Sequence, residues 1–147
     1  MSEQIPTGCI FCEILAGRAE GSFVYRDEAV AAFMDLRPVN AGHVLVVPVR
    51  HAAMLAELNI EDGMQMFRVA QSVAAALRNT GLKCEGVNLF LADGRAAGQD
   101  VWHVHLHVFP RFAGDGHHLR FHPDYFKPHT RQEIESTAEK LRAVLGA

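Results

Sequence analysis

Three histidines alternate with apolar residues in the segment His103-Val104-His105-Leu106-His107. We expect residues 101–109 to form one long strand that ends at Pro110. Successive side chains of a strand point to opposite faces, so the aliphatic residues would face a core and the histidines would share the other face. A neutral imidazole can act as a nucleophile or as a metal ligand near neutral pH. This face is therefore the first candidate for chemistry, and a solvated polar strand face is the simpler alternative.

The spacing of the three rings limits what they can do together. Next-but-one residues of a strand lie about 6.5–7 Å apart along the backbone, and His103 and His107 would lie about 13 Å apart. Three rings in such a row would reach one metal ion only with strain. We therefore expect them to divide their tasks along a groove, while a metal-binding His-x-His pair stays open as the alternative.

Cys9 and Cys12 form a C-x-x-C pair that is close enough to bind one ion. A structural zinc site generally needs four ligands, so two cysteines leave the alternative of an unbound, reduced pair. Together with Cys84 they make three cysteines, a number that is too small for a disulfide framework and, being odd, would leave one cysteine unpaired. This cysteine usage indicates a reducing compartment.

The elements that would carry these residues predict an antiparallel α+β fold. Short apolar or β-branched runs predict strands over residues 23–25, 29–34, 44–49, 86–91 and 101–109. The first strands follow one another without crossover helices, which favours antiparallel pairing. Helices are expected over residues 9–16, 60–79 and 131–145, and the two long ones carry apolar stripes. The stripe of the 60–79 helix is Met64, Phe67, Ala70, Val73, Ala74 and Leu77, and that of the last helix is Ile134, Ala138, Leu141 and Leu145.

Composition excludes several classes of protein. The chain has 147 residues, 49% of them hydrophobic, which predicts one globular domain. A net charge of −3 offers no global basic field, so we expect no nucleic-acid partner. No apolar run approaches the roughly 20 residues of a membrane span, and residues 1–4 lack the pattern of a signal peptide. We therefore expect a cytoplasmic protein with no membrane partner.

Four blocks of the sequence, in order, resemble the histidine-triad (HIT) family. The triad signature is similar to His103-Val104-His105-Leu106-His107-Val108-Phe109. Residues 33–48, from Phe33-Met34-Asp35 to Pro48, resemble the first nucleotide-binding strand and loop. Gly98-Gln99 is similar to the phosphate-site loop, and Cys9-Ile10-Phe11-Cys12 to the N-terminus of bacterial members. Beyond residue 111 the resemblance is weak.

The resemblance implies a fold and an assembly. The expected domain is a single HIT domain over residues 1–147, with a core at 9–111 and a C-terminal extension at 112–147 that holds the last helix. The implied fold is a five-stranded antiparallel sheet with two main helices. Two subunits of such proteins usually join into a homodimer with a continuous ten-stranded sheet.

The resemblance also implies a hydrolase that acts on the α-phosphate of dinucleoside polyphosphates or nucleoside phosphoramidates. His105 would be the nucleophile and form a nucleotidyl intermediate, from which water releases a nucleoside monophosphate. His107 would contact the phosphate oxygens, and His43 would join the hydrogen-bond network around the nucleophile. Covalent catalysis of this kind splits one hard displacement into two easier steps. Taken alone, His43 could also be a structural histidine at the start of a strand.

The nucleotide, with adenine as the expected base, would be held by residues outside the triad. Asp35 would accept hydrogen bonds from the ribose, although by itself it could simply initiate a turn. Gln99 would hold the transferring phosphoryl group, and apolar side chains would enclose the base, with Phe11, Ile14 and Phe33 as candidates. Asp100 stands where relatives often have Ser or Thr, and a carboxylate near a phosphate is repulsive unless it points away, is neutralised or donates a proton.

For the C-x-x-C pair, the resemblance implies a structural zinc site completed by His51 and His103. This would give His103 a structural role and leave His105 and His107 for chemistry; no organic cofactor is expected. Two rivals to the hydrolase remain: a zinc metallohydrolase that uses the His-x-His strand, and a nucleotide-binding regulatory module with negligible turnover. His117, His118, His122 and His129 have no family counterpart and are expected to be solvated.

Overall fold

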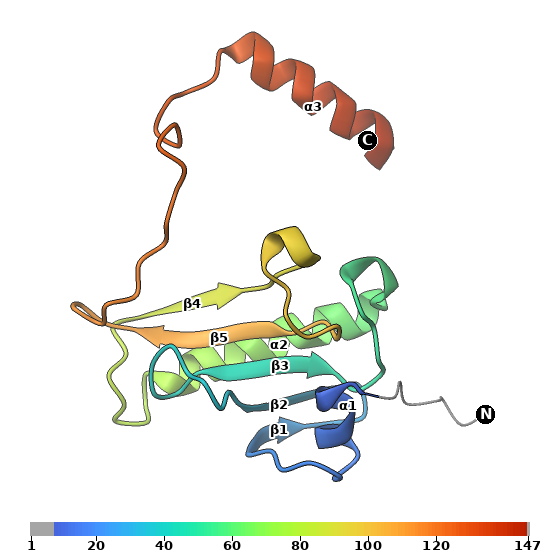
Figure 1. Cartoon of the computed structure of the whole chain (residues 1–147), viewed down its shortest axis with the longest axis vertical. Coiled ribbons are helices and arrows are strands. Elements are labelled where there is room, and N and C mark those ends of the chain that lie inside the picture. The colour runs from blue at the N-terminus through green and yellow to red at the C-terminus, as the bar shows by residue number, and fades with distance from the viewer. Residues whose placement is uncertain (1–7, 147) are drawn as a thin grey trace. The chain divides into compact units, whose positions relative to one another are not determined.

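The computed structural model describes residues 8–146 of the chain. Residues 1–4, which entered the prediction about a signal peptide, lie outside this range. The described part contains one five-stranded sheet in the order β1-β2-β3-β5-β4, and every neighbouring pair is antiparallel (Figure 1). The strands are β1 (Phe23–Arg26), β2 (Val30–Met34), β3 (Val44–Pro48), β4 (Gly86–Phe90) and β5 (Leu106–Arg111). The predicted antiparallel α+β fold is confirmed.

Two helices cover opposite faces of the sheet (Figure 1). Even-numbered residues of β2 and β3 pack against α2 (Ile60–Leu77), together with Val104 and Val108. Odd-numbered residues of the same strands pack against α1 (Ile10–Leu15), where Phe33 lies against Phe11. This alternation follows from the two-residue period of a strand. It places the aliphatic residues of the histidine segment on the α2 face, as the sequence predicts.

The histidine strand is shorter at its start than predicted and longer at its end. Residues 101–105 lie outside β5, and the strand continues through Pro110 to Arg111. The pairing of β5 with β3 ends at Val44↔Val108, so Pro110 has a strand neighbour only in β4. A residue without an N–H is tolerated where one neighbour has ended. The same reason explains Pro48, which ends β3 beyond the last pair with β5.

The buried stripe of α2 differs from the predicted one. Met64 and Phe67 are 68% and 55% exposed, whereas Met66 and Val69 are buried with Ala70 and Leu77. Apolar residues occur on several sides of this helix, so three- and four-residue spacing alone does not select one face. Met64 and Phe67, which belong to the predicted apolar stripe, therefore lie on the exposed side of the helix.

The chain divides into two compact units, one ending at Asp115 and one beginning at Gly116. The second unit holds α3 (Arg131–Leu145), whose bounds agree with the predicted helix. Thr130 and Glu133 form a reciprocal capping box at its start. None of its residues is buried, and of its predicted apolar stripe Ile134, Leu141 and Leu145 are exposed while Ala138 is half-buried. No helix within residues 8–146 is long and apolar enough to cross a membrane.

Candidate functional site

The site lies on the α1 face of the sheet, where two loops meet the start of β5. The loop between β2 and β3 ends at Gly42, which has φ 105°. A Cβ there would lie 2.9 Å from Leu77 Cδ2 and 3.3 Å from Pro110 Cγ, so only glycine fits both the conformation and the space. The next residue, His43, is thereby brought beside His107, which pairs with Leu45.

A pocket of about 290 Å³ opens over His105 and His107. Its apolar walls come from α1 and from strands β2 and β3, namely Ile10, Phe11, Ile14, Phe33 and Leu45. Its polar end carries His105, His107, Asp35 and Asp100. Seven predicted site residues therefore line one cavity: His105, His107, Asp35, Asp100, Phe11, Ile14 and Phe33. Phe11 also meets the His105 ring edge to face, with centroids 5.2 Å apart.

A backbone carbonyl sets the orientation of the His105 ring. The His105 Nδ1 lies 2.7 Å from the carbonyl oxygen of His103. A carbonyl only accepts, so Nδ1 must carry a proton and donate. In the neutral ring the lone pair is then on Nε2. This is the ring nitrogen that a nucleophilic histidine needs to present.

A second chain of hydrogen bonds orients His43 and His107. The backbone N–H of Val39 donates to His43 Nδ1 at 3.0 Å, which leaves the proton of that ring on Nε2. His43 Nε2 then donates to His107 Nδ1 at 2.9 Å, and the His107 proton is left on Nε2. Burial, with repulsion from His105 and His43, lowers the pKa of His107 to about 4, so this ring is neutral at pH 7. His107 therefore offers an N–H donor beside the lone pair of His105.

Asp35, His43 and His107 lie close enough to hold a metal ion by distance alone. The hydrogen bonds argue against one, because the His43 nitrogen that faces the group carries a proton and has no lone pair to offer. Asp35 Oδ2 lies 3.6 Å from this nitrogen, and Asp35 Oδ1 accepts from the backbone N–H of Arg37. Asp35 thus has a turn-forming contact and also lines the pocket.

Gln99 does not line this pocket. Its Oε1 accepts from the N–H of Gly94 at 2.7 Å, and its Nε2 donates to the carbonyls of Ala53 and Val101. The side chain is buried, and these bonds brace the loop between β4 and β5. The predicted contact of Gln99 with a phosphoryl group stays a prediction, whereas its bracing of this loop is observed.

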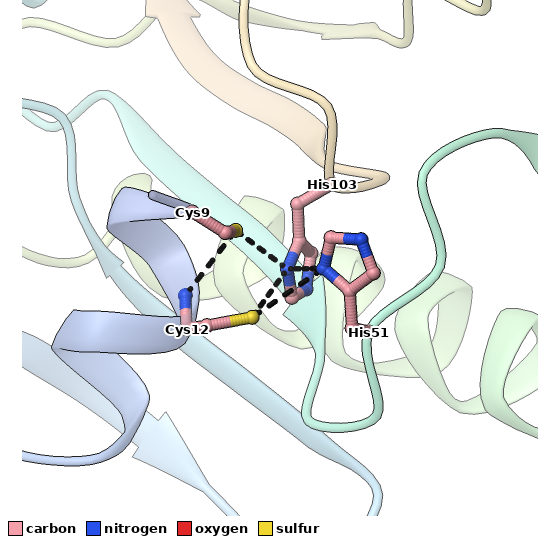
Figure 2. Close-up of side chains that lie close together, drawn as sticks. All are labelled: Cys9, Cys12, His51 and His103. Atoms are coloured by element: carbon pink, nitrogen blue, oxygen red, sulfur yellow. Dashed lines mark hydrogen bonds between the residues drawn. The ribbon is translucent and has the colours of Figure 1, made fainter. Parts of the chain in front are cut away.

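The four predicted metal ligands form a separate cluster (Figure 2). Cys9 caps the start of α1, and the N–H of Cys12 points at its sulfur at 3.5 Å. His51 follows β3, and the His103 ring is fully buried between the cysteines and the Pro48 carbonyl at the end of β3. All four ligand atoms lie within 4.8 Å of one another. The His103 ring therefore faces the cysteines, while the His105 ring faces the pocket.

The chemistry of the cluster fits a tetrahedral ion. His103 Nε2 donates to the carbonyl of Pro48 at 2.8 Å, so its Nδ1 lone pair faces the cysteines. Around zinc, neighbouring ligand atoms are separated by about 3.4 Å for two nitrogens and about 3.6 Å for nitrogen and sulfur. The observed separations are 3.2 Å for His51 Nδ1 and His103 Nδ1, and 3.4–3.5 Å for three nitrogen–sulfur pairs, Cys9–His103, Cys12–His51 and Cys12–His103.

The protonation of the cluster depends on whether an ion is bound. Burial lowers the pKa of His103 to about 4, which keeps its ring neutral and able to coordinate. Burial and the neighbouring Cys9 raise the pKa of the Cys12 thiol to about 12. A bound divalent cation would reverse this effect and hold the thiolate.

The geometry can be compared with known proteins. A match to the HIT domain family covers residues 16–114. The chain belongs to the HIT domain family. Protein hit of Bacillus subtilis is 38% identical over 138 residues, which cover 92% of this chain and 94% of that protein.

Two solved HIT structures have related folds. A Zn-bound histidine triad family protein from Mycobacterium smegmatis has a TM-score of 0.73 at 35% identity, over 93% of this chain and 97% of that one. A histidine triad nucleotide-binding protein from Candida albicans has a TM-score of 0.83 at 26% identity, over 95% of this chain and 98% of that one.

Sequence reasoning about this HIT domain missed two charged residues of the pocket, Glu20 and Arg37. The sequence contained a weak indication for Arg37, because it stands two positions after Asp35 in a predicted loop, and none for Glu20. The backbone partners of the histidines, the Val39 N–H and the Pro48 carbonyl, cannot be recognised from residue type either.

Proposed function

We propose that this HIT domain hydrolyses nucleoside phosphate derivatives at the α-phosphorus through a nucleotidyl-His105 intermediate. The observation that carries the proposal is the hydrogen bond from His105 Nδ1 to the His103 carbonyl. It leaves a lone pair on Nε2 of a ring that lines a nucleotide-sized pocket. His107 Nε2–H beside it would donate to a phosphate oxygen.

The reaction would proceed in two displacements. His105 Nε2 attacks phosphorus, the P–O or P–N bond to the leaving group breaks with its electron pair, and a leaving amine takes up a proton from solvent. Water then attacks the same phosphorus and loses a proton to solvent, the electron pair of the P–N bond returns to His105 Nε2, and a nucleoside monophosphate leaves. The base, which we expect to be adenine, would lie against the apolar wall formed by Phe11, Ile14 and Phe33, and Asp35 would accept from the ribose hydroxyls.

The test is to trap the intermediate. We expect wild-type protein, quenched after mixing with an adenosine phosphoramidate or diadenosine triphosphate, to carry one adenylyl group on His105 in peptide mass spectrometry. His105→Asn should form no adduct and no product. Turnover that survives in His105→Asn would refute the proposal, and AMP binding without turnover of either substrate would favour the regulatory module.

We further propose that Cys9, Cys12, His51 and His103 hold a structural zinc ion, as the fit of the cluster supports. Zinc there would tie α1 to the end of β3 and to the histidine segment. It requires reduced thiols, in agreement with the expected cytoplasmic location. With all four positions filled by protein, this site would leave none open for substrate, which disfavours the metallohydrolase.

We also propose the homodimer. Strand β4 ends the sheet, and Leu89 and Phe90 at this edge are exposed, as is the Met64 and Phe67 surface of α2. An unpaired edge beside apolar side chains suits pairing with a second copy. Light scattering should give twice the chain mass, and Phe67→Glu should lower it; a monomeric wild type would contradict the proposal.

A further inference from the structure

The charges around the candidate pocket are unbalanced. Among the described residues that line it, three carry carboxylates, Glu20, Asp35 and Asp100, and one carries a guanidinium, Arg37. No lysine lines it, and His107 is neutral because burial lowers its pKa to about 4. The pocket that would receive a phosphate derivative is therefore rich in negative charge.

Asp100 is the carboxylate that stands beside the reacting atom. Its Oδ1 lies 3.7 Å from His105 Nε2, the nitrogen that would attack phosphorus. Its other oxygen lies 3.9 Å from Arg37 Nη2, and this arginine is 89% exposed, so solvent weakens the compensation. The charge of Asp100 therefore acts mainly on His105 Nε2.

The position of Asp100 is built into the loop. The preceding residue, Gln99, is buried, and its amide makes three hydrogen bonds to backbone groups. Gly98 has φ 88°, so the loop turns through a conformation that favours glycine immediately before this brace. Asp100 follows this braced residue, which fixes its backbone at the mouth of the site.

We propose that Asp100 selects the leaving group of the reaction. A polyphosphate leaving group brings further negative charge to within a few bonds of the attacked phosphorus, where it meets this carboxylate. An amine leaving group is neutral or, with a basic tail, cationic, and Asp100 attracts the cation. The substrate class is then nucleoside phosphoramidates with neutral or basic amines rather than dinucleoside polyphosphates. This inference rests on the proposed function.

The size of the effect follows from exposure. Asp100 is 65% exposed, so water and salt screen its field. Exposed charges a few ångströms apart change an equilibrium or a rate by about 1.5- to 5-fold for each unit of charge. We expect about this change in kcat/KM for each unit of charge added to the leaving group.

The experiment compares amidates that share the same scissile bond and differ only in the charge of the leaving amine. Three AMP amidates with the same P–N bond would carry a cationic, a neutral or an anionic tail on the amine, with diadenosine triphosphate as a fourth substrate. We expect kcat/KM of wild type to fall in the order cationic, neutral, anionic. Asp100→Asn should bring the kcat/KM values of the three amidates closer to one another and raise kcat/KM on diadenosine triphosphate.

Two further variants separate charge at the site from overall charge. Glu85→Gln makes the same net change at an exposed residue before β4, beside Arg111 rather than His105, and should keep the wild-type order. Arg37→Gln removes the cation next to Asp100 and should widen the spread of kcat/KM values among the three amidates. The wild-type spread should also narrow as salt rises from about 50 to about 500 mM, because screening weakens the interaction.

Each outcome decides something. An equal spread in wild type and Asp100→Asn, or a wild type that prefers the anionic tail, overturns the leaving-group inference while the nucleotidyl-His105 reaction stands. A wild type that turns over none of the four substrates and forms no adduct overturns both.

Discussion

At the residue scale, the candidate site depends on which nitrogen of each histidine carries the proton. Two backbone groups decide this, the Val39 N–H for the His43–His107 pair and the His103 carbonyl for His105. The alternation of residues 103–107 was enough to predict that the histidines share a side of the chain. The alternation could not predict the backbone partners, because the backbone carbonyl is the same in every residue type and the sequence does not indicate which one a histidine ring will contact.

The hydrogen bond from His43 to His107 can be tested by removing its donor. His43→Phe should slow formation of the His105 adduct about 10-fold, because His107 loses the partner that fixes its proton on Nε2. His43→Gln keeps an N–H donor and should recover part of the rate. Single-turnover quench experiments measure both, with the melting temperature as the control for folding. Equal rates in all three proteins would contradict the predicted role.

Stability should depend on pH through His107. Burial lowers its pKa from 6.5 to about 4 in the folded chain, so between these pH values the unfolded chain binds a proton that the folded chain does not. The free energy of unfolding should therefore fall as pH drops from about 6.5 toward about 4. Urea unfolding at several pH values measures this slope.

The matched variant for this titration is His107→Gln, which has no ionisable ring. Its stability should fall less steeply over the same pH range. Identical slopes in the two proteins would exclude His107 as a source of the pH dependence.

At the element scale, the strands were predictable, but the side of α2 that faces the sheet was not. Alternating or β-branched runs locate β2 and β3 to within a residue, because burial on a sheet leaves a two-residue period. For α2, Met64 and Met66 are both apolar, and the sequence does not say which faces the sheet. Contact with the strands decides it, since Met66 packs with Val69 and Ala70 against the core.

This pair of methionines gives a matched stability test. Met66 is 2% exposed, and Met66→Ala should lower the free energy of unfolding by about 2–5 kcal/mol through lost burial and a cavity. Met64→Ala makes the same chemical change on the exposed side and should cost far less. Chemical denaturation measures both at low protein concentration. A larger loss in Met64→Ala would contradict the observed face.

Metal removal should affect α1 more than the rest of the fold. This helix has six residues and is too short to be stable alone, so it depends on its contacts with the sheet and on the Cys9 and Cys12 cluster. We expect purified protein to contain one zinc ion per chain, and chelation to lower the melting temperature by about 5–10 °C.

Cysteine variants distinguish the cluster from thiols in general. Cys9→Ser should lose zinc and resemble the chelated protein. Cys84→Ser should keep its zinc, because Cys84 lies beside β4 and its sulfur contacts the carbonyl of Gly86. Zinc content by elemental analysis measures both, and full zinc in Cys9→Ser would refute the proposed ligand set.

At the scale of the whole molecule, the chain consists of two units with separate internal contacts. The first unit ends at Asp115, whose carboxylate accepts from Arg111 at 2.6 and 3.0 Å and from Asn40 at 2.9 Å. A long-range bond to Asn40 is invisible in a linear sequence.

Truncation tests this boundary. A chain that stops after Asp115 should keep a melting temperature within about 2–4 °C of the full chain, an interval that corresponds to about 1 kcal/mol for a domain of this size. A chain that stops after Ala113 loses the buried Asp115 carboxylate and should melt lower. Equal melting temperatures in the two shortened chains would contradict the anchoring role of Asp115.

The cluster of Figure 2 has a consequence for the time course of folding. It joins α1 to His103 across 91–94 positions of sequence, and such distant contacts form late because a long loop must first close. We expect β3 and β5 to pair before α1 becomes helical. The wall of the pocket that carries Phe11 would then be absent from early folding species, and the nucleotide pocket would be the last feature of the molecule to form.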